Sequence, residues 1–316
     1  MKLRFVDREE IRRVLTFEVC VPLMREAMIA ASSGGINQPP RQILPLASGI
    51  GAFGVMPGVI SDGRFGAKLI SAIHRPAGSA LPALQGVVVL FDPSTGAPAC
   101  VLDAGEITRI RTAAASALAT EVFARSDADR LLVLGTGEQA EAHIRAIAAT
   151  RPLSRVVVWG RDPDHARSLA DTLAAEDNMA IEVAPDVRCA VAQADIVCTT
   201  TAAAEPVLKG DWLPEGVHVN LVGSSRAGPV EVDDDLVARA RYFVDSRANV
   251  LAQGSEFLNA RAAGRIDDAH ILGEIGEVLS GRIAGRRGPS EITAYKSLGS
   301  VVQDLWSGWR VYQALQ

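Results

Sequence analysis

The chain has 316 residues, of which 48% are hydrophobic, and its formal net charge at pH 7 is -5. This is enough apolar material for two buried cores, which excludes a disordered chain. Lys and Arg are scattered along the sequence, so we expect a small-molecule ligand and no nucleic-acid or membrane partner. No apolar run approaches the roughly 20 residues of a membrane span, and the amino-terminal residues lack the apolar core of a signal peptide. We therefore expect a cytoplasmic protein.

Cysteine and histidine spacing gives no sign of a metal site. No C-x-x-C pair occurs, which in a cytoplasmic protein predicts reduced cysteines that fill the core. The five histidines are far apart, and none is spaced to share a helix face with another. We expect no metal. The cysteines are Cys20, Cys100, Cys189 and Cys198.

The first third of the chain has the pattern of helices followed by an antiparallel sheet. Apolar residues at helical spacing over 7–33 predict one or two helices, interrupted near Pro22. Prolines and glycines between Pro39 and Gly58 then predict short strands and turns.

Two stronger strands and a long helix follow. Strands are predicted at Phe65–Ile73 and 86–91, and the turn Asp-Pro-Ser-Thr-Gly predicts a hairpin between the second of them and 98–102. The alanine-rich stretch 108–123 predicts a helix that can pack closely on its neighbours.

The stretch 131–140, LLVLGTGEQA, predicts a dinucleotide site. A short apolar strand leads into G-x-G-x-x-A and then into a helical sequence, which is the order of a phosphate-binding strand, turn and helix. Gly135 allows the tight turn, Gly137 lets the backbone approach the pyrophosphate, and Ala140 permits close packing of helix on strand. An ordinary glycine turn is the alternative.

Short apolar strands alternate with helices beyond this point, which predicts a doubly wound parallel sheet. The fold class is therefore α/β. The tail 292–315 reads as helix and is expected to pack on the first domain. The predicted strands are 131–134, 156–159, 181–183, 195–199, 218–222 and 242–244.

The end of the second strand of such a sheet selects the cofactor, because an acid there binds the ribose 2′-hydroxyl and a cation accepts a 2′-phosphate. The chain has Gly160-Arg161-Asp162, so we favour NADP(H) over NAD(H). Arg161 stacking on adenine, with Asp162 reaching the hydroxyl, is the alternative. The threonines at 199–201 can line the nicotinamide side or simply form a turn. The expected cofactor-binding residues are Thr112, Gly135, Thr136, Gly137, Glu138, Gln139, Gly160, Arg161, Thr199, Thr200, Thr201 and Val222.

Three cations in the first domain suggest an anionic substrate. Lys68 lies in an apolar strand and Arg111 heads an alanine-rich helix, where an unpaired charge is expensive. Arg41 follows two prolines. Each of the three can instead pair with a carboxylate of the chain or extend to water.

The chain resembles the ornithine cyclodeaminase and mu-crystallin superfamily through motifs that occur in order over nearly its whole length. The resemblance implies a homodimer, in which a Rossmann domain at 119–291 is inserted in an α+β substrate-binding and dimerisation domain made of 1–118 and 292–316. It also implies that Arg41, Lys68 and Arg111 bind the α-carboxylate of an amino or imino acid, with Lys68 and Arg111 as the catalytic residues. The motifs are VMPG (55–58), GAK ending at Lys68, LQGVVVLFDPSTG (84–96), RTAAASALAT (111–120), GTGEQA (135–140), GSSRAGPVEVD (223–233), YFVDS (242–246), GEIGEVLSG (273–281) and YKSLG (295–299).

Departures from the family pattern favour its ketimine reductase branch. Cyclodeaminases of the family have carboxylates where this chain has Gly54 and Ser225, whereas GSSR followed by EVD resembles mu-crystallin. Leu84 replaces a histidine found in many relatives, which leaves the proton donor open. We expect NAD(P)H-dependent reduction of an α-imino acid, such as Δ1-pyrroline-2-carboxylate or Δ1-piperideine-2-carboxylate. A redox-neutral ornithine cyclodeaminase and a non-enzymatic NADPH-binding protein are the alternatives.

Overall fold

The computed structural model describes residues 3–73, 84–225 and 227–316, apart from the side chain of Ser48. The chain forms two units, one made of Met1–Arg111 with Ser300–Gln316 and the other of Thr112–Gly299. The second unit is inserted between two segments of the first. Its boundaries fall at 112 and 299, where 119 and 291 were expected, because α3 (Ala104–Phe123) runs from one unit into the other and a strand follows residue 291.

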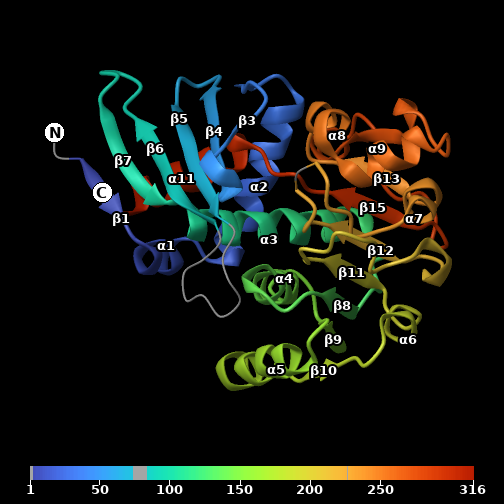
Figure 1. Ribbon diagram of the computed structural model, residues 1–316. Helices are drawn as coiled ribbons and strands as arrows, with labels where there is room; N and C mark the ends of the chain where they lie inside the picture. Colours follow the sequence, from blue (N-terminus) through green and yellow to red (C-terminus); the bar gives the residue numbers. More distant parts are fainter. Residues whose placement is uncertain (1–2, 74–83, 226) are drawn as a thin grey trace. The chain divides into compact units, whose positions relative to one another are not determined.

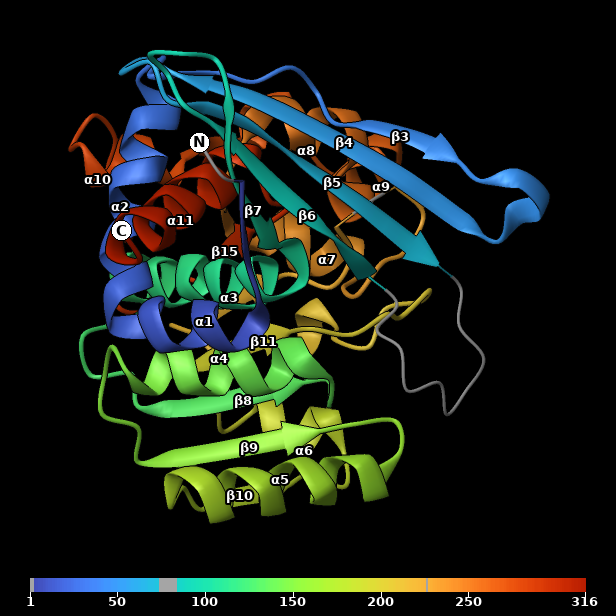
Figure 2. The same ribbon diagram turned by 90° about the vertical axis from the view of Figure 1, so that its left-hand side faces the viewer.

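The first unit has a mixed sheet (Figure 2), whose strand order in the described residues is β1-β7-β6-β5-β4-β2, with β3 also paired to β4. The predicted hairpin of β6 and β7 is confirmed, and its pairing is antiparallel. The elements are β1 (Arg4–Val6), α1 (Arg8–Val14), α2 (Phe17–Ser32), β2 (Ile36–Asn37), β3 (Gln42–Pro45), β4 (Gly51–Ile60), β5 (Phe65–Ile73), β6 (Leu84–Phe91), β7 (Pro98–Asp103) and α11 (Val301–Ala314).

Two prolines mislead the sequence prediction here. The helical region breaks at Leu15 and Thr16, whereas Pro22 lies inside α2. The region ending at Gly58 contains one ten-residue strand, β4, in addition to the short β3. Pro57 fits in β4 because β3 pairs with β4 only as far as Val55 and β2 begins pairing at Val59, so the missing N–H falls between them.

One face of this sheet is covered by α11. A Cβ added at Gly66 of β5 would lie 2.9 Å from Leu305 Cδ2, so helix and strand approach closely. Residues that share this face, such as Met56 and Val88, are buried. The expectation that the tail helix packs on the first domain is confirmed.

The second unit is a parallel sheet with helices on both faces (Figure 1). Its eight described strands have the order β10-β9-β8-β11-β12-β15-β13-β14. From β8 the chain adds β9 and β10 on one side and β11 and β12 on the other, so the strand order reverses between β8 and β11. The elements are β8 (Arg130–Leu134), α4 (Glu138–Ala148), β9 (Arg155–Trp159), α5 (Pro163–Asp177), β10 (Ile181–Val183), α6 (Val187–Val191), β11 (Ile196–Thr199), β12 (His218–Leu221), α7 (Asp234–Arg239), β13 (Arg241–Val244), α8 (Arg247–Gln253), α9 (Ser255–Ala262), β14 (Ile271–Glu274), α10 (Ile275–Leu279) and β15 (Thr293–Lys296).

All six predicted strands are present, and two more are added. The tail is not helical from residue 292: Thr293–Lys296 forms β15, which pairs with β12 and β13, and α11 begins only at Val301. The four residues of β15 are all buried and therefore show no alternation of apolar and polar residues. The sequence reads as helix there because the apolar stripe of α11 extends the helical pattern back across them.

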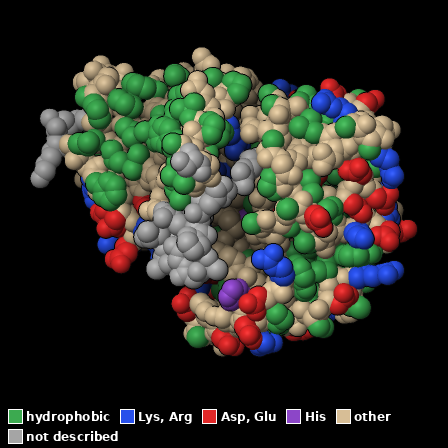
Figure 3. Space-filling model, viewed as in Figure 1, with side chains coloured by type: hydrophobic (Ala, Val, Ile, Leu, Met, Phe, Trp, Pro, Cys, Tyr) green, Lys and Arg blue, Asp and Glu red, His purple; other side chains and the backbone are tan. Residues whose placement is uncertain are grey.

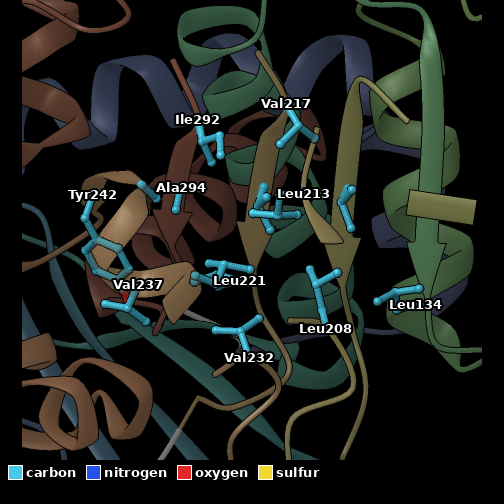
Figure 4. Packing of buried hydrophobic residues seen from close by; sticks show 14 of the residues in the cluster. Leu134, Leu208, Leu213, Val217, Leu221, Val232, Val237, Tyr242, Ile292 and Ala294 are labelled. Atoms are coloured by element: carbon cyan, nitrogen blue, oxygen red, sulfur yellow. The ribbon is translucent and has the colours of Figure 1, made fainter. Parts of the chain in front are cut away.

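The core of the second unit lies around β12, β13 and β15. Leu221, Tyr242 and Ala294, one from each strand, belong to one buried apolar cluster, and Figure 4 shows them beside residues of the connecting segments. Cys20, Cys100 and Cys198 are buried, as expected for core residues, but Cys189 on α6 is exposed.

Candidate functional site

The glycine-rich turn after β8 has the geometry that a dinucleotide phosphate requires. Gly135 has φ +128°, and a Cβ there would lie 2.5 Å from Thr200 Oγ1, so only glycine fits. Gly137 is the N-cap of α4. A Cβ added at Gly137 would meet no described atom within 4 Å, which leaves room for a pyrophosphate beside the amide groups that begin the helix.

The end of β9 packs against this turn. A Cβ added at Gly160 would lie 2.5 Å from Thr136 Cγ2. Asp162 is the N-cap of α5 and accepts a hydrogen bond from the backbone N–H of Asp164 at 2.9 Å. Arg161 is exposed and makes no hydrogen bond or ion pair with the described part of the chain. Arg161 is therefore available to an anion, whereas Asp162 already caps a helix.

The three threonines at the end of β11, residues 199–201, use their hydroxyl groups within the protein. Thr199 Oγ1 and Thr201 Oγ1 donate to Glu231 at 2.7 and 2.8 Å, and Thr200 Oγ1 donates to the carbonyl of Leu134 at 3.0 Å. A cofactor would meet these residues through backbone, methyl groups or oxygen lone pairs. Their hydroxyl protons serve the loop, which is the turn chemistry named above as the alternative.

Most of the expected cofactor residues follow the carboxyl ends of β8, β9, β11 and β12, which form one edge of the parallel sheet. Glu138 and Gln139 are the first two residues of α4. Val222 follows β12, and its backbone N–H donates to the carbonyl of Thr199 at 3.1 Å. Thr112 is different, because it is a buried residue of α3 and not part of a strand end.

A buried ionic network lies at the same edge, and the sequence analysis missed it. Lys296 Nζ is 2.9 Å from Glu256 Oε2 and donates to Ser224 Oγ at 2.5 Å, and Ser224 Oγ donates to Glu256. Burial raises the pKa of Glu231, and the charge of Lys296 partly opposes this shift. The only sequence signal was that Ser224, Glu231 and Lys296 lie in the motifs GSSRAGPVEVD and YKSLG, whereas Glu256 lies in neither.

The first unit brings two of the three predicted cations together on one carboxylate. Lys68 Nζ and Arg111 Nε each donate to Asp304 Oδ1 at 3.0 Å, and Arg111 Nη1 donates to Gln303 Oε1 at 2.5 Å. Lys68 and Arg111 are 2% and 5% exposed. Because two cations share one carboxylate, the group keeps a net positive charge when Lys68 is protonated.

Burial, with the nearby charges of Arg111 and Arg41, lowers the pKa of Lys68 to about 8 against the opposing effect of Asp304. Arg41 therefore acts on Lys68 electrostatically. Lys68 is mostly protonated at neutral pH and can lose its proton at mildly alkaline pH. A bound carboxylate would shift this equilibrium toward the charged form.

Gln303 and Asp304 were not expected as site residues. Both are fully buried on α11, in a segment where the sequence analysis noted only the apolar stripe. Two adjacent polar residues inside the apolar run Val301–Trp306 were the available signal, because a buried carboxylate needs a cation.

The two places where the resemblance puts the carboxylates of cyclodeaminases hold Gly54 and Ser225. Gly54 is buried on β4, and a Cβ there would lie 2.9 Å from Ile70 Cγ1. Ser225 follows β12 and is partly exposed. Leu84 begins β6 and faces Ala72 across the sheet. The arginine of GSSR, residue 226, lies outside the described residues.

No helix in the described parts of the chain is long and apolar enough to cross a membrane. Among the same residues, no group of three or more His, Cys, Asp and Glu side chains is arranged to hold a metal ion.

Comparison with known proteins agrees with this arrangement. A sequence model of the ornithine cyclodeaminase/mu-crystallin family matches residues 2–316. Ketimine reductase mu-crystallin of Mus musculus is 34% identical over 315 residues, which covers 98% of this chain and 96% of the mouse protein.

Solved structures are similar over almost the entire chain. Δ1-pyrroline-2-carboxylate reductase of Thermococcus litoralis, solved with NADH and L-proline, has a TM-score of 0.94 and 28% identity and covers 98% of this chain and 96% of its own. An archaeal alanine dehydrogenase dimer with bound NAD has a TM-score of 0.92 and 26% identity, covering 99% of this chain and 96% of its own.

Proposed function

Because the chain belongs to the ornithine cyclodeaminase/mu-crystallin family, we propose that it reduces α-imino acids to amino acids with a reduced nicotinamide cofactor. Cyclic imines such as Δ1-pyrroline-2-carboxylate and Δ1-piperideine-2-carboxylate are the proposed substrates. The observation that carries the proposal is the shared carboxylate, since Lys68 and Arg111 both donate to one oxygen of Asp304 and leave net positive charge for an anion. Its relatives named above include a ketimine reductase and a pyrroline-2-carboxylate reductase.

The cofactor, when bound, supplies a hydride from C4 of the nicotinamide to the imine carbon. The electron pair of the C=N bond then moves to nitrogen, and a protonated imine becomes the amine without any further proton. Lys68 and Arg111 bind the carboxylate next to the reacting carbon, with Arg41 adding charge. If the imine arrives unprotonated, Lys68 can donate the proton to its nitrogen.

For the cofactor we propose NADP(H) in preference to NAD(H). Arg161 is exposed, has no partner among the described residues and follows the second strand of the sheet, where a 2′-phosphate is recognised. Asp162, which would favour a 2′-hydroxyl, caps α5. Since the pyrroline-2-carboxylate reductase of Thermococcus litoralis was solved with NADH, we assign the preference to Arg161 of this chain and not to the family.

The chain is also proposed to form a homodimer through the face of the first unit's sheet opposite to α11. On that face Val55, Leu69 and Val87 lie in one row, and Ala67 and Val89 lie in the next. Figure 3 shows hydrophobic side chains gathered over these strands. An apolar sheet face of this kind favours association, and the archaeal alanine dehydrogenase relative is described as a dimer.

The activity is tested by mixing the purified protein with a panel of cyclic and acyclic imino acids and following the loss of NADPH or NADH. Lys68→Ala and Arg111→Ala should each lower kcat/KM by about a hundredfold or more, because each removes a charged contact to the substrate and leaves the remaining cation neutralised by Asp304. Retention of the far-ultraviolet circular dichroism spectrum checks that the variants are folded. A fully active double variant would contradict the assignment.

A parallel incubation with ornithine and a catalytic amount of NAD separates the reductase from a cyclodeaminase. Release of ammonia and proline without net cofactor consumption would overturn the proposal. Binding of NADPH with no turnover of any imino acid would instead indicate a binding protein.

A further inference from the structure

Glu231 joins the ends of two neighbouring strands of the second unit. Its Oε1 accepts from the backbone N–H and hydroxyl of Thr201, at 2.6 and 2.8 Å. Its Oε2 accepts from the hydroxyl of Thr199 at 2.7 Å and from the backbone N–H groups of Gly223 and Ser224 at 2.7 and 3.3 Å. Five donors from the segments after β11 and β12 therefore converge on one fully buried carboxylate.

The joint is formed by Glu231 with Thr199, Thr201, Gly223 and Ser224, and its backbone is packed too tightly for a side chain at Gly223. A Cβ added at Gly223 would lie 2.0 Å from the carbonyl oxygen of Thr201 and 2.5 Å from Glu231 Oε1. The two segments are thus in direct contact, with the carboxylate as the common acceptor. Glu231 is itself held in place, since its backbone N–H donates to Glu256 Oε1 at 3.3 Å.

The joint also touches the phosphate-binding turn. Thr200 lies between the two threonines that bind Glu231, and its hydroxyl oxygen is the atom that a Cβ at Gly135 would strike. The backbone N–H of Thr200 donates to the carbonyl of Leu134 at 2.8 Å. Any shift of the joint would therefore be transmitted to the end of β8.

The location of the joint indicates which half of a dinucleotide it serves. In a doubly wound sheet the adenosine ribose is recognised after the second strand, here β9, and the ligand crosses the point where strand order reverses, here between β8 and β11. The other half of the ligand, which carries the nicotinamide, then lies over β11 and β12.

We infer that Glu231 is a positioning residue for the nicotinamide half of the bound cofactor, an inference that rests on the dinucleotide binding proposed above. It touches no reacting atom. It holds the segments after β11 and β12 in the one arrangement on which the nicotinamide and its ribose can rest. The adenosine half, bound over β9, does not depend on it.

The test compares a whole dinucleotide with its adenosine fragment. In Glu231→Gln an amide NH2 group replaces one acceptor and faces N–H and O–H donors, so the joint opens while side-chain volume is kept. The dissociation constants of NADPH and of adenosine 2′,5′-bisphosphate are measured by calorimetry for parent and variant, with NADH and AMP as a second pair. We expect the variant to bind the dinucleotide at least about tenfold more weakly and the fragment within about twofold of the parent.

Asp195→Asn is the matched control. Asp195 is also a buried carboxylate with converging donors, Arg125 and Arg130, but it precedes β11 and so lies at the opposite edge of the sheet. Its loss should lower thermal stability without weakening the dinucleotide relative to the fragment. If Glu231→Gln does not fold, Thr199→Val removes one donor to Glu231 at nearly constant volume and should give a smaller shift in the same direction.

Equal weakening of both ligands in Glu231→Gln, no weakening of either, or the same selective loss in Asp195→Asn would overturn the inference. A parent protein that binds NADPH but reduces no imino acid would refute the proposed reaction and leave this test intact. A parent that binds neither dinucleotide would refute both.

Discussion

Lys68 and Arg111 donate hydrogen bonds to the same atom, Asp304 Oδ1, each across 3.0 Å. They come from β5 and α3, whereas the carboxylate comes from α11 near the end of the chain. Buried cations in such proximity require a counter-charge, because the repulsion between them is weakly screened away from water.

Replacing Asp304 by Asn should therefore destabilise the protein. We expect the free energy of unfolding to fall by about 3 kcal/mol, because the variant leaves two buried cations without their carboxylate. Urea denaturation at pH 7 measures the change. Glu106→Gln is the control, since Glu106 pairs with Arg12 and Arg109, which are more exposed than Lys68. An equal loss in both variants would contradict a special role for Asp304.

The pKa of Lys68 predicts how activity depends on pH. Burial lowers this pKa to about 8, so Lys68 is protonated below that value and neutral above it. If the charged form binds the substrate carboxylate, kcat/KM should fall as the pH rises through about 8, since this parameter reports the free enzyme. Lys68→Arg keeps its charge at alkaline pH. If Lys68→Arg is active and its kcat/KM no longer falls at alkaline pH, the result supports the assignment. If its kcat/KM falls as in the parent, the decline belongs to another titrating group.

Arg161 should determine the preference for NADPH. Arg161→Ala removes the cation proposed to accept the 2′-phosphate, so kcat/KM with NADPH should fall by about tenfold, as expected for one charge-assisted contact, while NADH is unaffected. Arg167→Ala is the matched control, because Arg167 is an exposed arginine on α5 that pairs with Asp164. The measured quantity is the ratio of kcat/KM for the two cofactors. The same ratio in parent and Arg161→Ala would show that Arg161 does not discriminate.

The proposed dimer depends on the face of the first unit's sheet opposite to α11. Val89→Lys places a charge in the middle of this face, beside Ala67 and Val101, and should convert the dimer to monomer because a buried, unpaired ammonium is expensive. Light scattering after gel filtration gives the mass. Leu272→Lys, at a partly exposed position of the second unit, should leave the mass unchanged. A Val89→Lys protein of unaltered mass would place any interface elsewhere.

Because two of its histidines are buried, the folded protein should become less stable in acid. Burial lowers the pKa of His143 to about 4 and that of His218 to about 3, in the latter case with help from the charge of Arg286. The unfolded chain therefore takes up protons below about pH 6.5 that the folded chain does not, and stability falls as the pH drops from about 6.5 toward 4. Each histidine contributes a slope of about 1.4 kcal/mol per pH unit in this window. The free energy of unfolding is measured by denaturation between pH 7 and 5 for the parent and for His143→Gln. Its slope against pH should differ between the two proteins by the equivalent of about one bound proton.

The central strand, turn and helix could be predicted from local sequence because their signals are local. An apolar run, a glycine with φ +128° and a helix start lie within a dozen consecutive residues, so the pattern specifies the structure. The hairpin of β6 and β7 and the strand β5 were predictable for the same reason. Lys68 and Arg111 were identifiable as unusual because charge in an apolar segment requires a partner.

The identity of those partners was not predictable, because it depends on contacts between residues far apart in the chain. Asp304 meets Lys68 across 236 positions, and its own neighbourhood in sequence reads only as an apolar helix. The strand β15 was missed because four residues acquire a strand structure only from the pairing that β12 and β13 offer. Sequence alone therefore determined the kind of fold and the cations that need an anion. Tertiary structure decided which carboxylates balance them, because burial and distance, which set the energy of a charge, exist only once the chain is folded.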